Sequence, residues 1–182
     1  MLKTITSIND HPHHAHLPLR TSRAPVIAAQ EFKDAMAKLV FSISVVTARH
    51  GAEQLGRTVT SFMPLSADPP HIAVSIDVTS RLIDLIGSSE KFSISFPSLG
   101  QEMIADTFAG KRSIADRFSV ADWGYWPSGN PRLPETAISI DCELAGSIDV
   151  GDHILFIGAV VEMEIGIARD CLLWNERDYL RL

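Results

Sequence analysis

Apolar and polar side chains alternate with a period of two through much of the chain after residue 40. The segment 71–77 places Ile72, Val74 and Ile76 on one side, and 91–96 alternates phenylalanine or isoleucine with serine. This is the period of a strand that is buried on one face. Further strands are predicted at 42–48, 56–62, 137–148 and 153–165, the last two joined by a hairpin.

Three segments have the period of a helix instead. The segment 30–40 gathers Phe32, Met36 and other apolar residues into one stripe, which predicts an amphipathic helix packed on a larger body. Shorter helices are predicted at 80–88, and at 98–108 after a capping box. Six strands with peripheral helices favour a mainly β fold, an antiparallel barrel with helical decoration.

The first 28 residues differ from the rest of the chain because they show no sustained period. They are rich in proline and contain four closely spaced histidines, His11, His13, His14 and His16. Imidazole is a common metal ligand, but no Cys, Asp or Glu at ligand spacing completes a site beyond Asp10. We therefore expect a flexible His/Pro-rich arm at 1–28, no metal site, and one globular domain at 29–182.

Composition narrows the class of protein. The chain has 182 residues, of which 46% are hydrophobic and 21% charged, which suits a single domain with a sizeable core. A formal net charge of −6 without a basic run argues against nucleic acid as a partner. No apolar stretch has the length of a membrane span, and no signal peptide is visible, so we expect a cytoplasmic protein. Cys142 and Cys171 have neither zinc nor disulfide spacing and are interpreted as reduced thiols.

Familiar enzyme fingerprints are absent from the sequence. There is no G-x-G-x-x-G after a strand, no G-x-x-x-x-G-K-[ST], no H-E-x-x-H and no G-x-S-x-G. Any activity must therefore come from a site built on the barrel itself.

The segment 56–70 is the most informative candidate for such a site. It concentrates the hydroxyl side chains Thr58, Thr60, Ser61 and Ser66 on one strand and its exit. Small hydroxyls and nearby backbone N–H groups suit the polar edge of a flat heteroaromatic ring. A Thr/Ser-rich strand at a barrel surface would have the same composition, so the pattern alone leaves both interpretations open.

A second candidate is Asp77–Arg81, where a strand end leads into a helix. Backbone N–H groups, the hydroxyl of Ser80 and the guanidinium of Arg81 together favour an anion such as phosphate. The alternative is an ordinary helix cap with a solvated arginine.

Three weaker candidates complete the search. The cations Lys111, Arg112 and Arg117 either reach a phosphate or offset nearby carboxylates on a solvated face. His153 stands at the lip of a hairpin, where it either approaches a ligand or is simply solvated. The segment 174–179 either covers a pocket or packs on a partner subunit.

Taken in order, several of these segments match the pattern of a known family. They are the helix FKDAMAKL, Val45-Val46-Thr47, GRTVTSF at 56–62 followed by SADPP at 66–70, HIAVSID, KFSISF, ADRF at 115–118, GDH at 151–153 and Tyr179. This order over residues 30–182 resembles the flavin reductase-like family, which includes the reductase components of two-component flavin monooxygenases.

The resemblance implies an FMN-binding split β-barrel, antiparallel and Greek-key-like, with peripheral α-helices. It implies an NAD(P)H:flavin oxidoreductase that supplies reduced FMN or FAD to a partner monooxygenase, and a homodimer with the flavin near the subunit interface. His153 would be the catalytic residue, placed beside the flavin or nicotinamide. The residues implied to bind the cofactor are Thr58, Val59, Thr60 and Ser61 for the ring, with Ser66, Ser80, Arg81 and Arg117 toward the phosphate. Asp77 is a further cofactor-binding candidate.

The sequence departs from the family pattern at several positions. Val59 replaces the usual alanine, and Leu82 replaces a threonine that is common in the phosphate turn. These departures leave FMN or FAD open, and they keep three alternatives. The first is a flavoprotein with bound flavin that reduces a corrin, quinone or iron chelate. The second is a non-enzymatic flavin or haem carrier or sensor, and the third is an interaction module without a cofactor.

Overall fold

The computed structural model of the chain describes residues 7–17, 22–167 and 170–180, with side chains omitted at 114–116. Its strands are β1 (His14–His16), β2 (Phe41–Ser42), β3 (Ser44–His50), β4 (Glu53–Val59), β5 (Phe62–Ala67), β6 (Pro70–Asp77), β7 (Lys91–Phe96), β8 (Gly124–Tyr125), β9 (Pro131–Arg132), β10 (Ile138–Asp149), β11 (His153–Ile165), β12 (Leu173–Asn175) and β13 (Asp178–Leu180). Its helical segments are η1 (Ile8–Asp10), α1 (Ala29–Met36), α2 (Leu82–Ser89), α3 (Glu102–Asp106), the π-turn η2 (Thr107–Lys111) and the 3₁₀ turn η3 (Ile114–Ser119).

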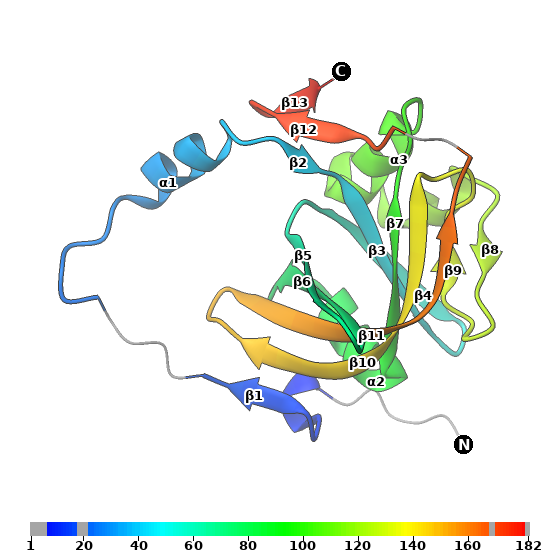
Figure 1. Cartoon of the computed structure of the whole chain (residues 1–182), viewed down its shortest axis with the longest axis horizontal. Coiled ribbons are helices and arrows are strands. Elements are labelled where there is room, and N and C mark those ends of the chain that lie inside the picture. Colours follow the sequence, from blue (N-terminus) through cyan, green and yellow to red (C-terminus); the bar gives the residue numbers. More distant parts are fainter. Residues whose placement is uncertain (1–6, 18–21, 168–169, 181–182) are drawn as a thin grey trace.

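One rolled sheet forms the body of the molecule. Its strands follow the order β4-β3-β7-β10-β11-β6-β5, and every neighbouring pair on this path is antiparallel. The two edge strands, β4 and β5, are consecutive in the chain, so the link Thr60–Ser61 passes from one edge to the other (Figure 1). The sheet is thus a barrel left open between β4 and β5, which confirms the predicted mainly β, split-barrel fold.

The barrel interior is apolar and α2 closes one end of it. Phe92, Phe156 and Ile94 are completely buried among the aliphatic side chains of the strands. The apolar face of α2 packs against this cluster through Leu82 and Ile86. Burial of this continuous apolar surface provides most of the driving force for the fold.

The predicted strand at 56–62 is wrong in one respect that matters for the site. The chain turns at Gly51 with φ of 62°, and β4 begins directly after this turn at Glu53 and ends at Val59. Thr60 and Ser61 lie between strands, and β5 then runs along the opposite edge. The hydroxyl-rich segment is therefore a crossing between two sheet edges rather than the middle of one strand.

The prediction that 91–96 is a half-buried strand is also wrong. Ser93 and Ser95 are as buried as the apolar residues between them. The indole of Trp126 donates a hydrogen bond to Ser93 Oγ at 2.9 Å, and Ser139 donates to Ser95 at 3.1 Å. Small hydroxyls can be buried once their hydrogen bonds are satisfied. The serines of β7 can therefore lie in the interior, and both faces of this central strand are covered.

The two shorter helices form with changed limits. The predicted helix 80–88 is α2, and the predicted 98–108 is split into α3 and the π-turn η2, within which Gly110 adopts a φ of 93°. Gln101 Oε1 accepts the Ser98 N–H at 2.9 Å, which is one half of the predicted capping box. Ser98 Oγ instead donates to the carbonyl of Glu135 at 2.6 Å.

The helix predicted at 30–40 forms over Ala29–Met36, but its apolar stripe does not pack on the barrel of its own chain. Phe32 is 52% exposed and Leu39 is 48% exposed. Figure 1 shows α1 standing apart from the rolled sheet. Two ion pairs connect α1 and the residues after it to the C-terminal hairpin: Lys38 with Glu176 at 2.7 Å, and Asp34 with Arg177. The amphipathic pattern is correct, whereas the packing inferred from it is not present within one chain.

The described part of the N-terminal segment lies against the barrel. Ile8 is 4% exposed and packs beside α2, where its N–H donates to Asp84 at 3.3 Å. The strand β1 pairs in parallel with Ser147–Asp149 of β10. The division of the chain near residue 28 stays a prediction, and residues 18–21 of the segment lie outside the described part.

Replacing Ile8 with alanine should therefore lower the free energy of unfolding by about 2–4 kcal/mol, because it empties a buried site against α2. Urea unfolding followed by circular dichroism measures this change. The matched control is Leu17→Ala, because Leu17 is 48% exposed on the same segment and its loss should cost less than about 0.5 kcal/mol. Equal effects of the two substitutions would contradict the docking of this segment.

In the described part of the chain, none of the helices has the length and apolarity needed to cross a bilayer.

Candidate functional site

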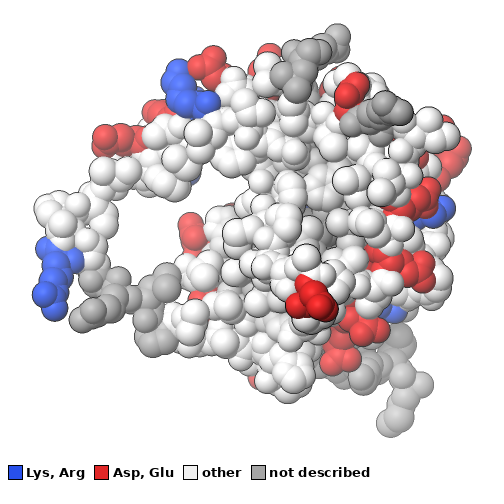
Figure 2. Space-filling model, in the orientation of Figure 1, with Lys and Arg blue, Asp and Glu red and all other residues white. Residues whose placement is uncertain are grey.

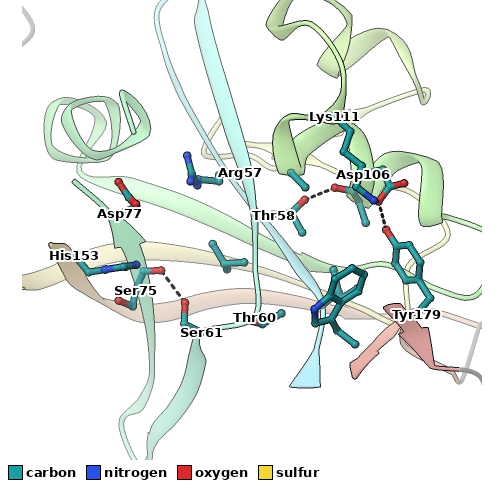
Figure 3. Close-up of a pocket in the computed structure, with 15 residues that line it drawn as sticks. Arg57, Thr58, Thr60, Ser61, Ser75, Asp77, Asp106, Lys111, His153 and Tyr179 are labelled. Atoms are coloured by element: carbon teal, nitrogen blue, oxygen red, sulfur yellow. Dashed lines mark hydrogen bonds and ion pairs between the residues drawn. The ribbon is translucent and has the colours of Figure 1, made fainter. Parts of the chain in front are cut away.

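A cleft with a volume of about 350 Å³ opens where the two edges of the rolled sheet approach each other. Its walls come from the end of β4, the Thr60–Ser61 link, β6, the start of β11, the α3–η2 segment and the C-terminal hairpin (Figure 3). The volume lies within the range of small-molecule sites. The lining residues are Ile43, Arg57, Thr58, Val59, Thr60, Ser61, Ser75, Asp77, Ala105, Asp106, Ala109, Lys111, His153, Trp174 and Tyr179.

The hydroxyl-rich wall is held in place by its own hydrogen bonds. Thr58 Oγ1 donates to the carbonyl of Ala105 at 2.6 Å, which joins β4 to α3. Ser61 Oγ donates to the carbonyl of Ser75 at 2.9 Å, and the Ser75 N–H donates back to the Ser61 carbonyl at 2.9 Å. Two of the three hydroxyls are thus committed to fixing the wall, which leaves Thr60 and the backbone of the link to face a ligand.

Asp77 and His153 lie directly opposite each other in the β6–β11 register. Asp77 Oδ1 accepts hydrogen bonds from the Thr79 hydroxyl at 2.5 Å and the Thr79 N–H at 2.8 Å. These bonds hold the pKa of Asp77 below its ordinary value, with smaller contributions from Arg57 and His153. Asp77 is therefore ionised at neutral pH. His153 Nδ1 lies 2.9 Å from Asp152 Oδ1, which orients the imidazole at the mouth of the cleft.

The opposite wall contains a linked set of three polar side chains. Lys111 Nζ lies 2.7 Å from Asp106 Oδ1, and Tyr179 donates its hydroxyl hydrogen bond to the same oxygen at 2.6 Å. Burial acts to raise the pKa of Asp106, but the hydrogen bonds from Lys111 and Tyr179 outweigh it and hold the pKa below its ordinary value. Burial, and then the bond to Asp106, raises the pKa of Tyr179, so the phenol remains a donor.

The C-terminal hairpin supplies the aromatic part of this wall. Trp174 contacts Tyr179 edge to face, with 5.2 Å between ring centroids. The sequence left segment 174–179 between a pocket cover and a subunit contact, and in this chain both aromatic residues line the cleft. Their signal in the sequence was aromatic composition alone, without spacing that could assign them to a site.

The cleft brings together six of the residues predicted for the site, and the other four lie elsewhere. Ser66 is exposed on β5. Ser80 accepts the Leu82 N–H at 3.4 Å, and Arg81 forms an ion pair with Glu53 at 2.7 Å. Arg117 lies behind β4, where its Nη1 donates to the carbonyl of Gly56 at 3.0 Å. The six that line the cleft are Thr58, Val59, Thr60, Ser61, Asp77 and His153.

Arg57 is a cleft residue that the sequence analysis named only as part of a motif. Because β4 is an edge strand, side chains from both of its faces reach the opening, so Arg57 and Thr58 line it together. The signal that could have found it is a cation placed among small hydroxyl residues.

No group of three or more His, Cys, Asp or Glu side chains in the described chain is arranged to hold a metal ion. Both cysteines are free thiols, and burial raises the pKa of Cys142 to about 12. A thiol with that pKa is protonated at neutral pH and is a poor nucleophile.

Comparison with known families identifies the chain. The model of the family described as flavin reductase like domain matches residues 36–182. The chain belongs to this flavin reductase family.

Individual members of the family cover nearly the same length. The chain is 33% identical over 158 residues to an NADH:riboflavin 5'-phosphate oxidoreductase of Streptomyces pristinaespiralis, covering 85% of this chain and 89% of that protein. It is 31% identical over 155 residues to the reductase component of 4-hydroxyphenylacetate 3-monooxygenase of Thermus thermophilus, covering 84% of this chain and 96% of the other.

Solved structures of the family agree with the fold. The flavin reductase HpaC, complexed with NADP⁺, superposes with a TM-score of 0.78 at 27% identity, covering 85% of this chain and 98% of that one. The flavin reductase PheA2 superposes with the same TM-score at 27% identity, covering 86% and 99%.

Proposed function

We propose that this protein is an NAD(P)H-dependent flavin reductase that reduces FMN or FAD and supplies the reduced flavin to a partner monooxygenase. The observation that carries the proposal is the cleft between β4 and β5, which presents Thr60 and the backbone of its link in a chain of this family. Relatives named as an NADH:riboflavin 5'-phosphate oxidoreductase and as a monooxygenase reductase component support it.

The residues of the cleft fit a flavin. A flat ring with donors and acceptors along one edge would meet the Thr60 hydroxyl and the backbone of Val59–Ser61, while Trp174 and Tyr179 would cover it on the side of the C-terminal hairpin. When bound, the flavin supplies the hydride-accepting chemistry. The protein aligns donor and acceptor and excludes water, and this role requires no classical general base.

His153 has the position expected of a residue that orients the nicotinamide donor. It lies at the cleft mouth, beside the ionised Asp77 and held by Asp152. Substitution His153→Ala should raise the KM for NADH about tenfold, which corresponds to the loss of one charge-assisted hydrogen bond, and should leave the Kd for FMN unchanged.

Steady-state kinetics and a flavin titration measure these two constants. The matched control is His71→Ala, because His71 lies on the same sheet at the start of β6 and outside the cleft. An unchanged KM for NADH in His153→Ala would remove the orienting role.

Oxidation of NADH and NADPH followed at 340 nm tests the proposed function, with and without added FMN or FAD. Turnover that saturates with added flavin supports the reductase. Flavin that remains bound during purification, with turnover only on another acceptor, would favour the alternative of a flavoprotein that reduces a corrin, quinone or iron chelate. Binding without turnover would favour a carrier.

A homodimer is part of the proposal, because large apolar side chains are exposed on α1, on β5 and at the end of β11. They are Phe32 and Met36 of α1, Met63 and Leu65 of β5, and Val161, Met163 and Ile165 of β11. The central part of the face in Figure 2 also carries few charged side chains. Apolar exposure on this scale marks an interaction surface, and a second copy of the chain is its proposed occupant. Light scattering after gel filtration should give twice the chain mass.

We also propose a cytoplasmic location and a division of the chain at residue 28.

A further inference from the structure

Arg57 differs from most of the other arginines in the described part of the chain because no hydrogen-bond or ion-pair partner is found for it there. Its guanidinium lines the cleft, and it makes no hydrogen bond or ion pair with the described residues. Five other arginines are each held by a hydrogen bond or an ion pair to another residue: Arg49, Arg81, Arg117, Arg132 and Arg177.

The other charges that line the cleft are already engaged. Lys111 Nζ forms an ion pair with Asp106 Oδ1 at 2.7 Å. Asp77 attracts Arg57 electrostatically, but its Oδ1 is occupied by the two hydrogen bonds from Thr79. In Figure 3 Arg57 lies between Asp77 and Thr58, toward the end of the cleft that also holds Lys111. The hydroxyls of Thr60 and Ser61 are drawn toward the other end. The end of the cleft at Arg57 is therefore charged, while Thr60 and Ser61 lie toward the other end, where His153 is also drawn.

A second guanidinium strengthens the positive potential at the charged end. Arg117 donates to the carbonyl of Gly56, the residue before Arg57, and its Nε is buried without a hydrogen-bond partner among the described residues. Burial, followed by repulsion from Arg57, lowers the pKa of Arg117. Two guanidinium groups close enough to repel each other are stabilised by an anion bound beside them.

We propose that Arg57 determines ligand specificity by binding a phosphate group of the flavin or of the nicotinamide donor, an inference that rests on the proposed reductase function. The planar guanidinium can donate two parallel hydrogen bonds to a phosphate, which gives both affinity and direction. The phosphate then lies at the charged end of the cleft, and the ring lies against the Thr60–Ser61 link. Ser66, Ser80 and Arg81 lie outside this arrangement.

The substitution Arg57→Met tests the assignment by comparing ligands with and without phosphate. Quenching of flavin fluorescence gives the Kd of FMN and of riboflavin for each variant. The affinity for FMN should fall about 10- to 100-fold, and the affinity for riboflavin should stay within about twofold. Arg57→Lys should retain more of the FMN affinity than Arg57→Met because it keeps the positive charge. It should not reach the wild-type affinity because an ammonium group cannot donate two parallel hydrogen bonds to one phosphate.

The matched control is Arg49→Met, which also removes one arginine from the β3–β4 pair. Arg49 lies outside the cleft, over the ring of Tyr125. Both Kd values should stay at their wild-type level in this variant, and thermal melts of all variants check that they remain folded.

If the affinity for FMN does not change in Arg57→Met, the KM values of nicotinamide donors show whether Arg57 binds a phosphate of the donor instead. The KM is measured for NADH, for NADPH and for the phosphate-free donor 1-benzyl-1,4-dihydronicotinamide. A rise confined to NADPH assigns Arg57 to the 2'-phosphate. An equal rise for NADH and NADPH, with the benzyl donor unchanged, assigns it to the pyrophosphate. Both outcomes support a phosphate site at Arg57.

Two outcomes would overturn the inference: no change in any constant, or an equal loss for ligands with and without phosphate. Failure of the proposed function gives a different result. In that case the wild-type protein would bind FMN more tightly than riboflavin through Arg57 and yet would oxidise no NADH or NADPH.

Discussion

Replacing Thr60 with tryptophan should abolish flavin binding and leave the fold intact. Thr60 lies in the link between the two sheet edges, and its partly exposed side chain lines the cleft. An indole at this position would fill much of a cleft of about 350 Å³ without entering the barrel core. The affinity for FMN should fall at least about 100-fold, which corresponds to about 2.8 kcal/mol of binding free energy.

A fluorescence titration measures this loss, and a thermal melt measures stability. The melting temperature should change by less than about 2 °C, since the side chain is not part of the core. The matched control Thr60→Ser keeps the hydroxyl and removes one methyl group, so its FMN affinity should stay within about threefold of wild type. Wild-type affinity in the tryptophan variant would show that the flavin binds elsewhere.

Replacing Phe108 with alanine should have the largest effect on stability, a loss of about 3–5 kcal/mol. Phe108 is completely buried in the η2 turn, with its ring 5.2 Å from Phe118 and 5.4 Å from Trp123 between centroids. Its ring also packs over Gly56, where an added Cβ would lie 2.6 Å from it. The η2 turn carries Ala109 and Lys111 of the cleft wall, so the same substitution should weaken flavin binding.

Urea unfolding measures the first effect, and a titration of the remaining folded protein measures the second. Met103→Ala is the control from the adjoining helix α3, because Met103 is 48% exposed and its truncation should cost less than about 1 kcal/mol. Losses of equal size for the two variants would contradict the role of Phe108 as the support of this wall.

The strands could be predicted wherever burial leaves a period of two in the sequence. Ile72, Val74 and Ile76 of β6 all face the core, as their alternation indicates. The same rule failed for β7, because the small hydroxyl residues Ser93 and Ser95 count as polar in a pattern but can be buried once hydrogen-bonded. Sequence periodicity records which residues are polar and does not show whether their hydrogen bonds are satisfied inside the protein.

The site was predictable only where its residues are neighbours in the chain. Thr58–Ser61 form one continuous motif, so a single pattern located that wall. Asp106, Lys111 and Tyr179 come together through side-chain hydrogen bonds between the α3–η2 segment and the C-terminal hairpin. No local pattern encodes such a contact.

The predicted phosphate residues illustrate the same limit from the other side. Arg81 follows a plausible anion-binding turn, but it is paired with Glu53 at the start of β4. Arg57 is the cleft cation that forms no hydrogen bond or ion pair with the described residues, and only the three-dimensional arrangement could show this.

Anaerobic mixing of the protein with NADH and a large excess of FMN tests the central claim most directly. Bleaching of the flavin absorbance near 450 nm counts how many flavin molecules each protein molecule reduces. We predict that many equivalents of FMN are bleached per chain, and that the Thr60→Trp variant bleaches none. Bleaching that stops at one equivalent would show a tightly held flavin that serves another acceptor, and no bleaching by the wild-type protein would contradict a flavin reductase altogether.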